Sequence, residues 1–213
     1  MKNAWKLFSY GDTPIYLKYW FLILLLFIPI SLISILFVSI LIHEVSHART
    51  AKKLGYKTDY IFIDILHGGA LIDGSYTKNN KHAISIAFAG PLSNLLLSLI
   101  GFLVATILIK YMPVSEEIMK FISSFISINI LLFAINLIPI YPLDGGRITK
   151  SLSNMVFGEK KGRLINGILS MVISTSAFIY SVYELNYILM IFSVVFIISS
   201  YFEIKPKDEE RLR

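Results

Sequence analysis

His43, Glu44 and His47 form the pattern H-E-x-x-H, whose residue types and spacing can bind a metal ion. On a helix, residues four apart lie on one face, so both imidazoles can reach a single ion. Zinc accepts histidine nitrogens as ligands. Glu44 follows the first histidine and projects beside such an ion, which suits a general base acting on water. The spacing therefore predicts a catalytic zinc site rather than an incidental pair of buried histidines.

A third ligand has to come from elsewhere in the chain, and Asp144 is the best candidate. It lies in the stretch 136–147, where two prolines and two glycines break a helix and leave the backbone free to turn an acid inward. The alternative is a loop carboxylate that pairs with Arg147. The chain has no cysteine, which excludes thiolate zinc ligands, disulfides and cysteine nucleophiles.

The elements that must position these residues are long apolar runs. Hydrophobic residues make up 55% of the 213 residues and charged residues 16%, against about 25% charged in soluble domains. This composition excludes a lone soluble globule and a disordered chain. We expect an all-α polytopic membrane protein, a single domain over residues 1–213, with a possible short β-hairpin within 60–74. The expected spans are about six: 14–30, 32–54, 82–109, 117–138, 164–183 and 187–202.

The basic residues predict how the chain is oriented across the membrane. With a cytosolic N-terminus, every Lys and Arg except Lys110 and Lys120 falls in a cytosolic segment, as the positive-inside rule requires. We therefore expect a multi-pass protein of the cell membrane with both termini in the cytosol. The second and fourth spans then both run toward the cytosol, which brings His43, His47 and Asp144 to the cytosolic leaflet. The net charge of +6 is thus assigned to membrane flanks and not to nucleic-acid binding.

Together, these motifs resemble the site-2 protease family of intramembrane zinc metalloproteases. The resemblance rests on residues 43–47 and on the N-x-x-P-x-x-x-L-D-G stretch 136–145. The small-residue stretch 89–94 and the glycine pair 68–69 add to it. The order and spacing match over residues 14–202 and resemble most closely the compact six-span subgroup typified by the sporulation factor-processing protease.

The resemblance implies cleavage of a peptide bond within or near a transmembrane segment of a single-span membrane protein. It implies one zinc ion held by His43, His47 and Asp144, with Glu44 activating water. It also implies that Asn136 holds the substrate strand or the oxyanion. No appended PDZ or CBS domain is expected, and a regulatory membrane partner is left open.

Further candidates for substrate binding are Gly68, Gly69 and Asn94. The first two lie in the apolar, β-branched stretch whose strand edge could pair with an extended substrate; the alternative is a loop resting on lipid. Asn94 is expected to bond either the site or a neighbouring helix. His67, which departs from the family pattern, is either an alternative ligand or a surface histidine.

Two other functions use the same residues. A metal or proton transporter could use the histidines and Asp144 as an ion relay, and a catalytically inactive homologue could keep the fold for membrane binding. A transporter commonly shows repeated halves, and no such repeat is present. An inactive homologue is expected to have lost Glu44 or a ligand, and this chain keeps all four residues. The sequence favours the enzyme.

Overall fold

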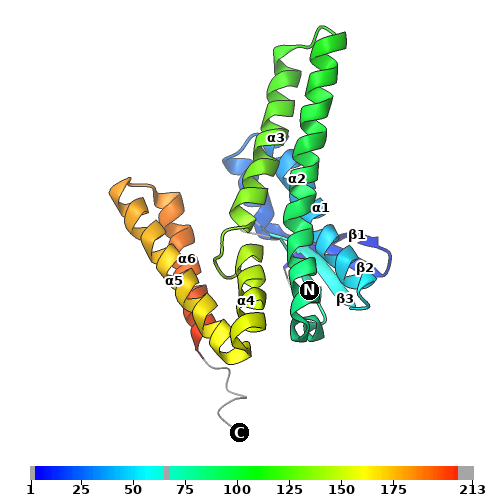
Figure 1. The fold of residues 1–213 in the computed structure, drawn as a ribbon. Helices are drawn as coiled ribbons and strands as arrows, with labels where there is room; N and C mark the ends of the chain where they lie inside the picture. The colour runs from blue at the N-terminus through cyan, green and yellow to red at the C-terminus, as the bar shows by residue number, and fades with distance from the viewer. Residues whose placement is uncertain (1–2, 65–67, 206–213) are drawn as a thin grey trace. The chain divides into compact units, whose positions relative to one another are not determined.

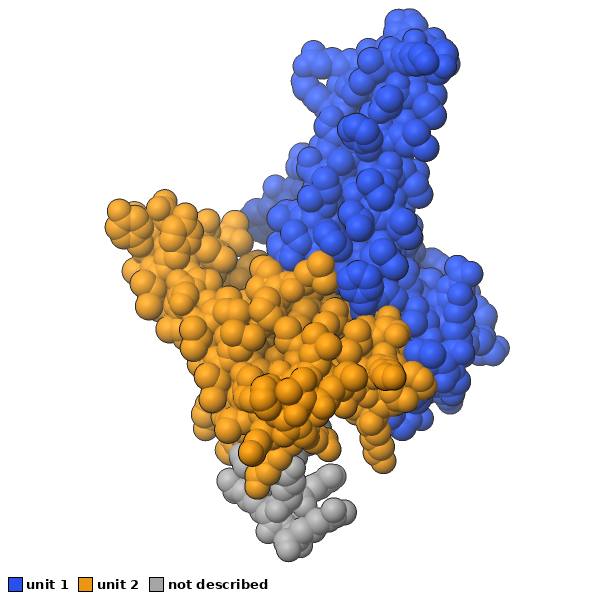
Figure 2. Space-filling view, in the orientation of Figure 1, with its two compact units in different colours: residues 1–76, 88–135 blue, residues 77–87, 136–213 orange. Residues whose placement is uncertain are grey.

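A computed structural model describes residues 3–64 and 68–205 of the chain (Figure 1). The chain forms two compact units, residues 1–76 with 88–135 and residues 77–87 with 136–213 (Figure 2). The elements are, in order, β1 Ala4–Tyr10, β2 Thr13–Lys18, the 3₁₀ helix η1 Tyr19–Leu26, α1 Ile30–Lys53, β3 Thr58–Ile63, β4 Gly68–Ile72, the 3₁₀ helix η2 Gly74–Lys78, α2 Asn80–Tyr111, α3 Glu116–Asn136, α4 Asp144–Phe157, α5 Glu159–Tyr183 and α6 Tyr187–Ile204.

A four-stranded sheet of order β1-β2-β3-β4 belongs to the first unit. The pairs β1–β2 and β3–β4 are antiparallel, and the second confirms the predicted hairpin. β2 and β3 are parallel, with Ile15 opposite Ile61. The chain passes through α1 between these two strands, as parallel neighbours require a crossover. Consequently β1 and β4 are the edge strands.

The helix α1 packs its buried face against this sheet. It begins after Pro29, whose fixed φ suits a helix start, and two lysines in its last turn offset the helix dipole. Near the end of α1, Ile15 and Ile61 bury Ala48. Near its beginning, Phe21 and Ile63 bury Ile33. The segment from β2 to η1 therefore runs alongside α1 in the opposite direction.

The prediction that residues 14–30 form a membrane-spanning α-helix is wrong. This stretch forms β2 and η1 instead of a membrane-length α-helix. Pro14 opens a strand whose Ile15 is completely buried against β3, and pairing with two neighbours favours the extended form. The direction alongside α1 is the one expected of a first span. Within the described residues, five helices are long and apolar enough to cross a membrane: α1, α2, α3, α5 and α6.

The second unit contains α4, α5 and α6 (Figure 1), and α5 packs against both of the other helices. A Cβ on Gly167 of α5 would collide with Ile204 of α6, and a Cβ on Gly162 would collide with Asn154 of α4. Small residues let helices in a membrane approach closely. Serines that are completely or almost completely buried continue this pattern along α5 and α6: Ser170, Ser174, Ser181, Ser193 and Ser200.

Candidate metal centre

His43, Glu44 and His47 lie on the buried face of α1. Each is at most 7% exposed. The two imidazole rings meet edge to face with centroids 4.7 Å apart. One ligand atom from each of the three residues lies within 4.8 Å of the others, which is close enough for a single ion. The helical spacing predicted from the sequence is therefore present as a compact donor group.

The two ring nitrogens of His43 have different partners. Its Nδ1 lies 2.5 Å from Oδ1 of Asn94 on α2. The Asn94 amide NH₂ donates to Oδ1 of Asn129 at 2.9 Å, so the Asn94 oxygen is the atom that faces the ring. His43 Nδ1–H is therefore the donor, and in the neutral imidazole Nε2 carries the lone pair that a metal requires. This answers the question left open for Asn94: it bonds both the site and a neighbouring helix, α3.

A second layer holds Asn94 in place. Asn129 of α3 donates to Oγ of Ser39 at 2.9 Å and to the carbonyl of Phe125 at 2.9 Å. Ser39, Asn94 and Asn129 are all completely buried. Ser39 precedes His43 by one helical turn, so α1, α2 and α3 are joined around the ligand. Such partners fix the tautomer and orientation of metal-binding histidines.

Gly90 of α2 provides the space that a metal ion needs. A Cβ at this position would collide with Nε2 of His43 and Nε2 of His47. Both Nε2 atoms thus converge on the point that a side chain at Gly90 would occupy. Neutral histidine nitrogens with an adjacent carboxylate fit zinc chemistry, and this convergence supports zinc as the ion for which the residues are arranged.

Gly68 lies against the carboxylate of Glu44. A Cβ on Gly68 would come within 2.6 Å of Glu44 Cγ and 2.7 Å of Oε1. Gly68 is the first residue of β4, an edge strand, so the predicted general base lies beside a sheet edge. Gly69 packs closely against a different side chain: a Cβ added to Gly69 would lie 2.6 Å from the Phe62 ring. His67 lies outside the described residues.

Asp144 is the first residue of α4 in the second unit and is 6% exposed. Its carboxylate lies 3.9 Å from Nη1 of Arg147. Gly145 permits a tight turn before α4, because a Cβ there would collide with the carbonyl oxygens of Leu137 and Ile138. Its role as third ligand stays a prediction, as does that of Asn136, the last residue of α3.

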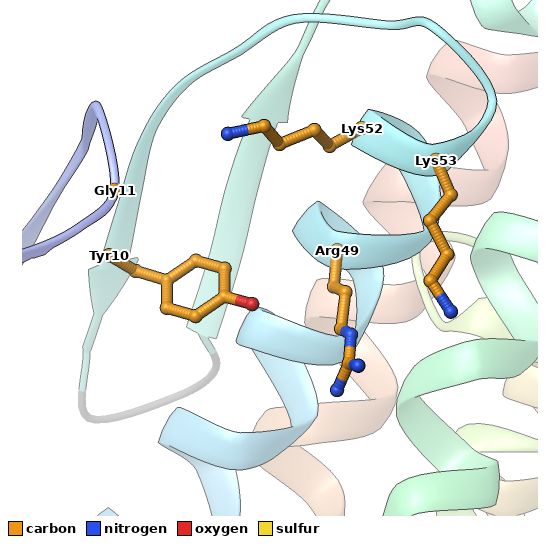
Figure 3. A pocket seen from close by; sticks show the side chains of 5 residues that line it. All are labelled: Tyr10, Gly11, Arg49, Lys52 and Lys53. Carbon is orange, nitrogen blue, oxygen red and sulfur yellow. The ribbon is translucent and has the colours of Figure 1, made fainter.

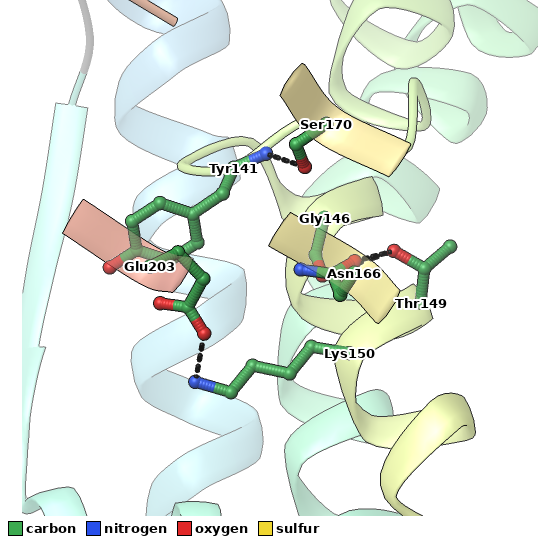
Figure 4. A network of polar contacts seen from close by, with 7 residues as sticks. All are labelled: Tyr141, Gly146, Thr149, Lys150, Asn166, Ser170 and Glu203. Atoms are coloured by element: carbon green, nitrogen blue, oxygen red, sulfur yellow. Dashed lines mark hydrogen bonds and ion pairs between the residues drawn. The ribbon is translucent and has the colours of Figure 1, made fainter. Parts of the chain in front are cut away.

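A polar network within the second unit fixes the segment that carries Asp144 (Figure 4). The backbone N–H of Tyr141 donates to Oγ of Ser170 on α5 at 3.0 Å. The hydroxyl of Thr149 on α4 lies 2.6 Å from Oδ1 of Asn166. Lys150 and Glu203 form an ion pair of 2.5 Å between α4 and α6. These contacts join α4 to α5 and α6 and hold its first turn.

Comparison with known proteins places this arrangement in a family. Residues 31–117 and 108–181 match Peptidase family M50 and together cover more than half of the chain. The chain belongs to this family. A solved structure, Site-2 Protease from Methanocaldococcus jannaschii, has a TM-score of 0.71 at 24% identity and covers 96% of both chains. It shares the fold, and the predicted resemblance to site-2 proteases is confirmed.

Curated relatives carry related names. Zinc metalloprotease MJ0392 of Methanocaldococcus jannaschii is 25% identical over 205 residues, which covers 91% of this chain and 58% of that protein. Stage IV sporulation protein FB of Bacillus subtilis is 25% identical over 127 residues, covering 60% of this chain and 42% of that protein. The chain thus spans little more than half the length of the first relative and less than half of the second.

Sequence reasoning missed three contributors to the site. Gly90 was noted only within the small-residue stretch 89–94, but it faces both histidines. Ser39 and Asn129 were not singled out. A signal was available: each is a polar residue within a long apolar run, and Ser39 stands four residues before His43 on the same helical face.

Proposed function

We propose that this chain is an intramembrane zinc endopeptidase that cleaves within or near a transmembrane segment of a single-span membrane protein. The observation that carries the proposal is the buried His43–Glu44–His47 group on a membrane-length helix. An ionisable residue costs at least about 2.5 kcal/mol near the centre of a membrane helix. Three such residues within one turn therefore indicate a functional centre.

His43, His47 and Asp144 are the proposed ligands. Two neutral histidines and one carboxylate leave a position open, as catalytic zinc sites require. Bound zinc would supply Lewis acidity toward the scissile carbonyl and make water nucleophilic at neutral pH. Asn94 keeps the proton of His43 on Nδ1, away from the ion.

Glu44 is the proposed general base. Its carboxylate accepts the proton of the attacking water and passes it to the leaving amine. Gly68 supports this role, because the absent side chain leaves the carboxylate room beside β4. Asn136 is proposed to hold the substrate backbone or the oxyanion.

The substrate is proposed to bind as an extended strand. A transmembrane helix has its amides satisfied internally, so cleavage requires local unwinding. The edge strand β4, which starts beside Glu44, offers backbone groups to such a segment. Gly68 and Gly69 would then line the path of the unwound chain.

The test is comparative membrane proteomics of cells with the natural chain and with Glu44→Gln. We expect one single-span protein to accumulate uncut in the variant, and purified variant to retain its zinc. If the chain is a transporter or an inactive homologue, no uncut single-span protein should accumulate in the Glu44→Gln cells. Zinc bound at one ion per chain with no difference in any membrane protein would refute the endopeptidase.

A further inference from the structure

A concave basic surface lies between the β1–β2 turn and the last turns of α1, within the first unit. It encloses about 510 Å³ and is lined by Tyr10 and Gly11 from the hairpin and by Arg49, Lys52 and Lys53 from α1 (Figure 3). The volume is in the range of small-molecule sites. None of these residues belongs to the proposed catalytic group.

Three cations lie in the last turns of α1, and no acidic side chain of the described residues pairs with them. Lys52 and Lys53 follow Arg49 by three and four residues, so each of them is a neighbour of Arg49 on the helix surface. Among the described residues, none of them forms an ion pair, and the exposed Asp12 of the hairpin turn pairs with none of them. Like charges at this spacing destabilise a helix. An anion between them would remove that penalty.

The β1–β2 hairpin forms the opposite wall of the cavity. Gly11 adopts a φ of +58°, a left-handed conformation that turns the chain sharply at the tip. A Cβ on Gly11 would lie 3.6 Å from Nζ of Lys52, so the ammonium group rests against the turn. Figure 3 shows the Lys52 side chain extended from α1 toward Gly11, and the Tyr10 ring with its hydroxyl directed toward α1. A donor hydroxyl thus lies across the cavity from the end of α1.

The surroundings identify the kind of anion. The cavity lies at the end of a membrane-length helix, and β1 exposes Trp5, Phe8 and Tyr10. Aromatic side chains of this kind gather at the level of lipid headgroups. An arginine fork matches phosphate oxygens in pairs. We propose that this surface binds the phosphate of an anionic phospholipid, with the acyl chains lying along the apolar side chains of the first unit.

The experiment measures phosphatidylglycerol and phosphatidylcholine adducts by native mass spectrometry on the full chain in neutral detergent. Each basic residue near anionic lipid strengthens binding about fivefold, so Lys52→Gln/Lys53→Gln should weaken phosphatidylglycerol binding about 25-fold. The matched control is Lys160→Gln/Lys161→Gln, which removes two adjacent exposed lysines at the start of α5. It should stay within about twofold of the natural chain, because neither lysine lines the cavity.

A second variant separates a shaped site from simple attraction. Arg49→Lys keeps the charge but loses the fork, so we expect several-fold weaker phosphatidylglycerol binding. Equal losses in the two lysine pairs, or no change in Arg49→Lys, would show general charge attraction and overturn the proposal. Equal affinity for phosphatidylcholine would also overturn it. Full displacement of phosphatidylglycerol by inorganic phosphate would assign the surface to a soluble anion.

Discussion

At the residue scale, the metal centre depends on which ring nitrogen of His43 carries the proton. Asn94 holds Nδ1 of His43, and Asn129 decides which end of the Asn94 amide points at the ring. The lone pair is thereby committed to Nε2 before any ion arrives. A chain of buried amides, and not the histidine alone, prepares the ligand.

Glu44→Gln should abolish cleavage and leave zinc in place. The amide keeps the size of the side chain but cannot accept a proton, and general base catalysis contributes about 10²–10⁴-fold in rate. The measurements are cleavage of a single-span substrate and the zinc content of the purified chain. Glu116→Gln, at the exposed start of α3, is the control and should cleave normally. Wild-type cleavage by the Glu44 variant would exclude this residue as the base.

Asn94→Ala should weaken zinc binding about 10–100-fold, because partners of ligating histidines contribute this much to affinity. Chelator competition measures the affinity, and ¹⁵N NMR of the imidazoles reports whether the proton leaves Nδ1. The matched control is Asn186→Ala, which removes the N-cap of α6. That change should cost about 1 kcal/mol of stability without altering zinc affinity. Unchanged tautomer signals in Asn94→Ala would contradict the positioning role.

At the element scale, the site requires α2 and β4 to approach α1 without side chains at two points. Gly90 opens the space in front of both Nε2 atoms, and Gly68 opens the space beside Glu44. In the proposed mechanism, the two glycines serve different parts of the reaction. Their substitution therefore separates metal binding from proton transfer.

Gly90→Ala should reduce zinc affinity about tenfold or more, since a methyl group forced into a packed site costs about 1–3 kcal/mol. Gly101→Ala, further along α2, is the control: its Cβ would meet the side chains of Ile126 and Phe125, away from the histidines. It should change stability and not zinc affinity. Equal zinc affinities in the two variants would mean that Gly90 serves packing only.

Gly68→Ala should lower the cleavage rate while zinc affinity stays within about twofold of the natural chain, because the added methyl group displaces the Glu44 carboxylate and not the imidazoles. Single-turnover cleavage and chelator competition together measure this. Gly74→Ala is the control, since a Cβ there meets nothing within 4 Å. A parallel loss of zinc would show that Gly68 supports the ligands instead.

The predictable part of this molecule is the part governed by local periodicity. Helices occupy five of the six predicted spans, and the spacing of His43 and His47 on one helix suffices to bring them together. The strands β1 and β2 were not predicted, because an apolar run such as 14–30 is compatible with a helix until its partner strand is known. Gly90 and Asn129 were missed because their contacts join different helices, which no local pattern reports.

At the scale of the whole molecule, the proposed orientation is open to direct measurement because the chain has no cysteine. Single cysteines can be introduced and labelled with a membrane-impermeant maleimide. We expect Asp12→Cys and Lys57→Cys to react only from the cytosolic side, and Met112→Cys and Glu184→Cys only from the other side. Labelling of Lys57→Cys and Glu184→Cys from the same side would refute the arrangement.

The parallel pairing of β2 with β3 has a consequence for biosynthesis. β2 leaves the ribosome before α1, and its partner β3 leaves after it. Unpaired strand amides are not tolerated in hydrocarbon, so the nascent β2 must stay in contact with water until α1 has entered the bilayer. Closure of the Ile15–Ile61 ladder therefore follows the insertion of α1. A chain whose α1 inserts wrongly cannot close the sheet, which exposes it to quality-control proteases.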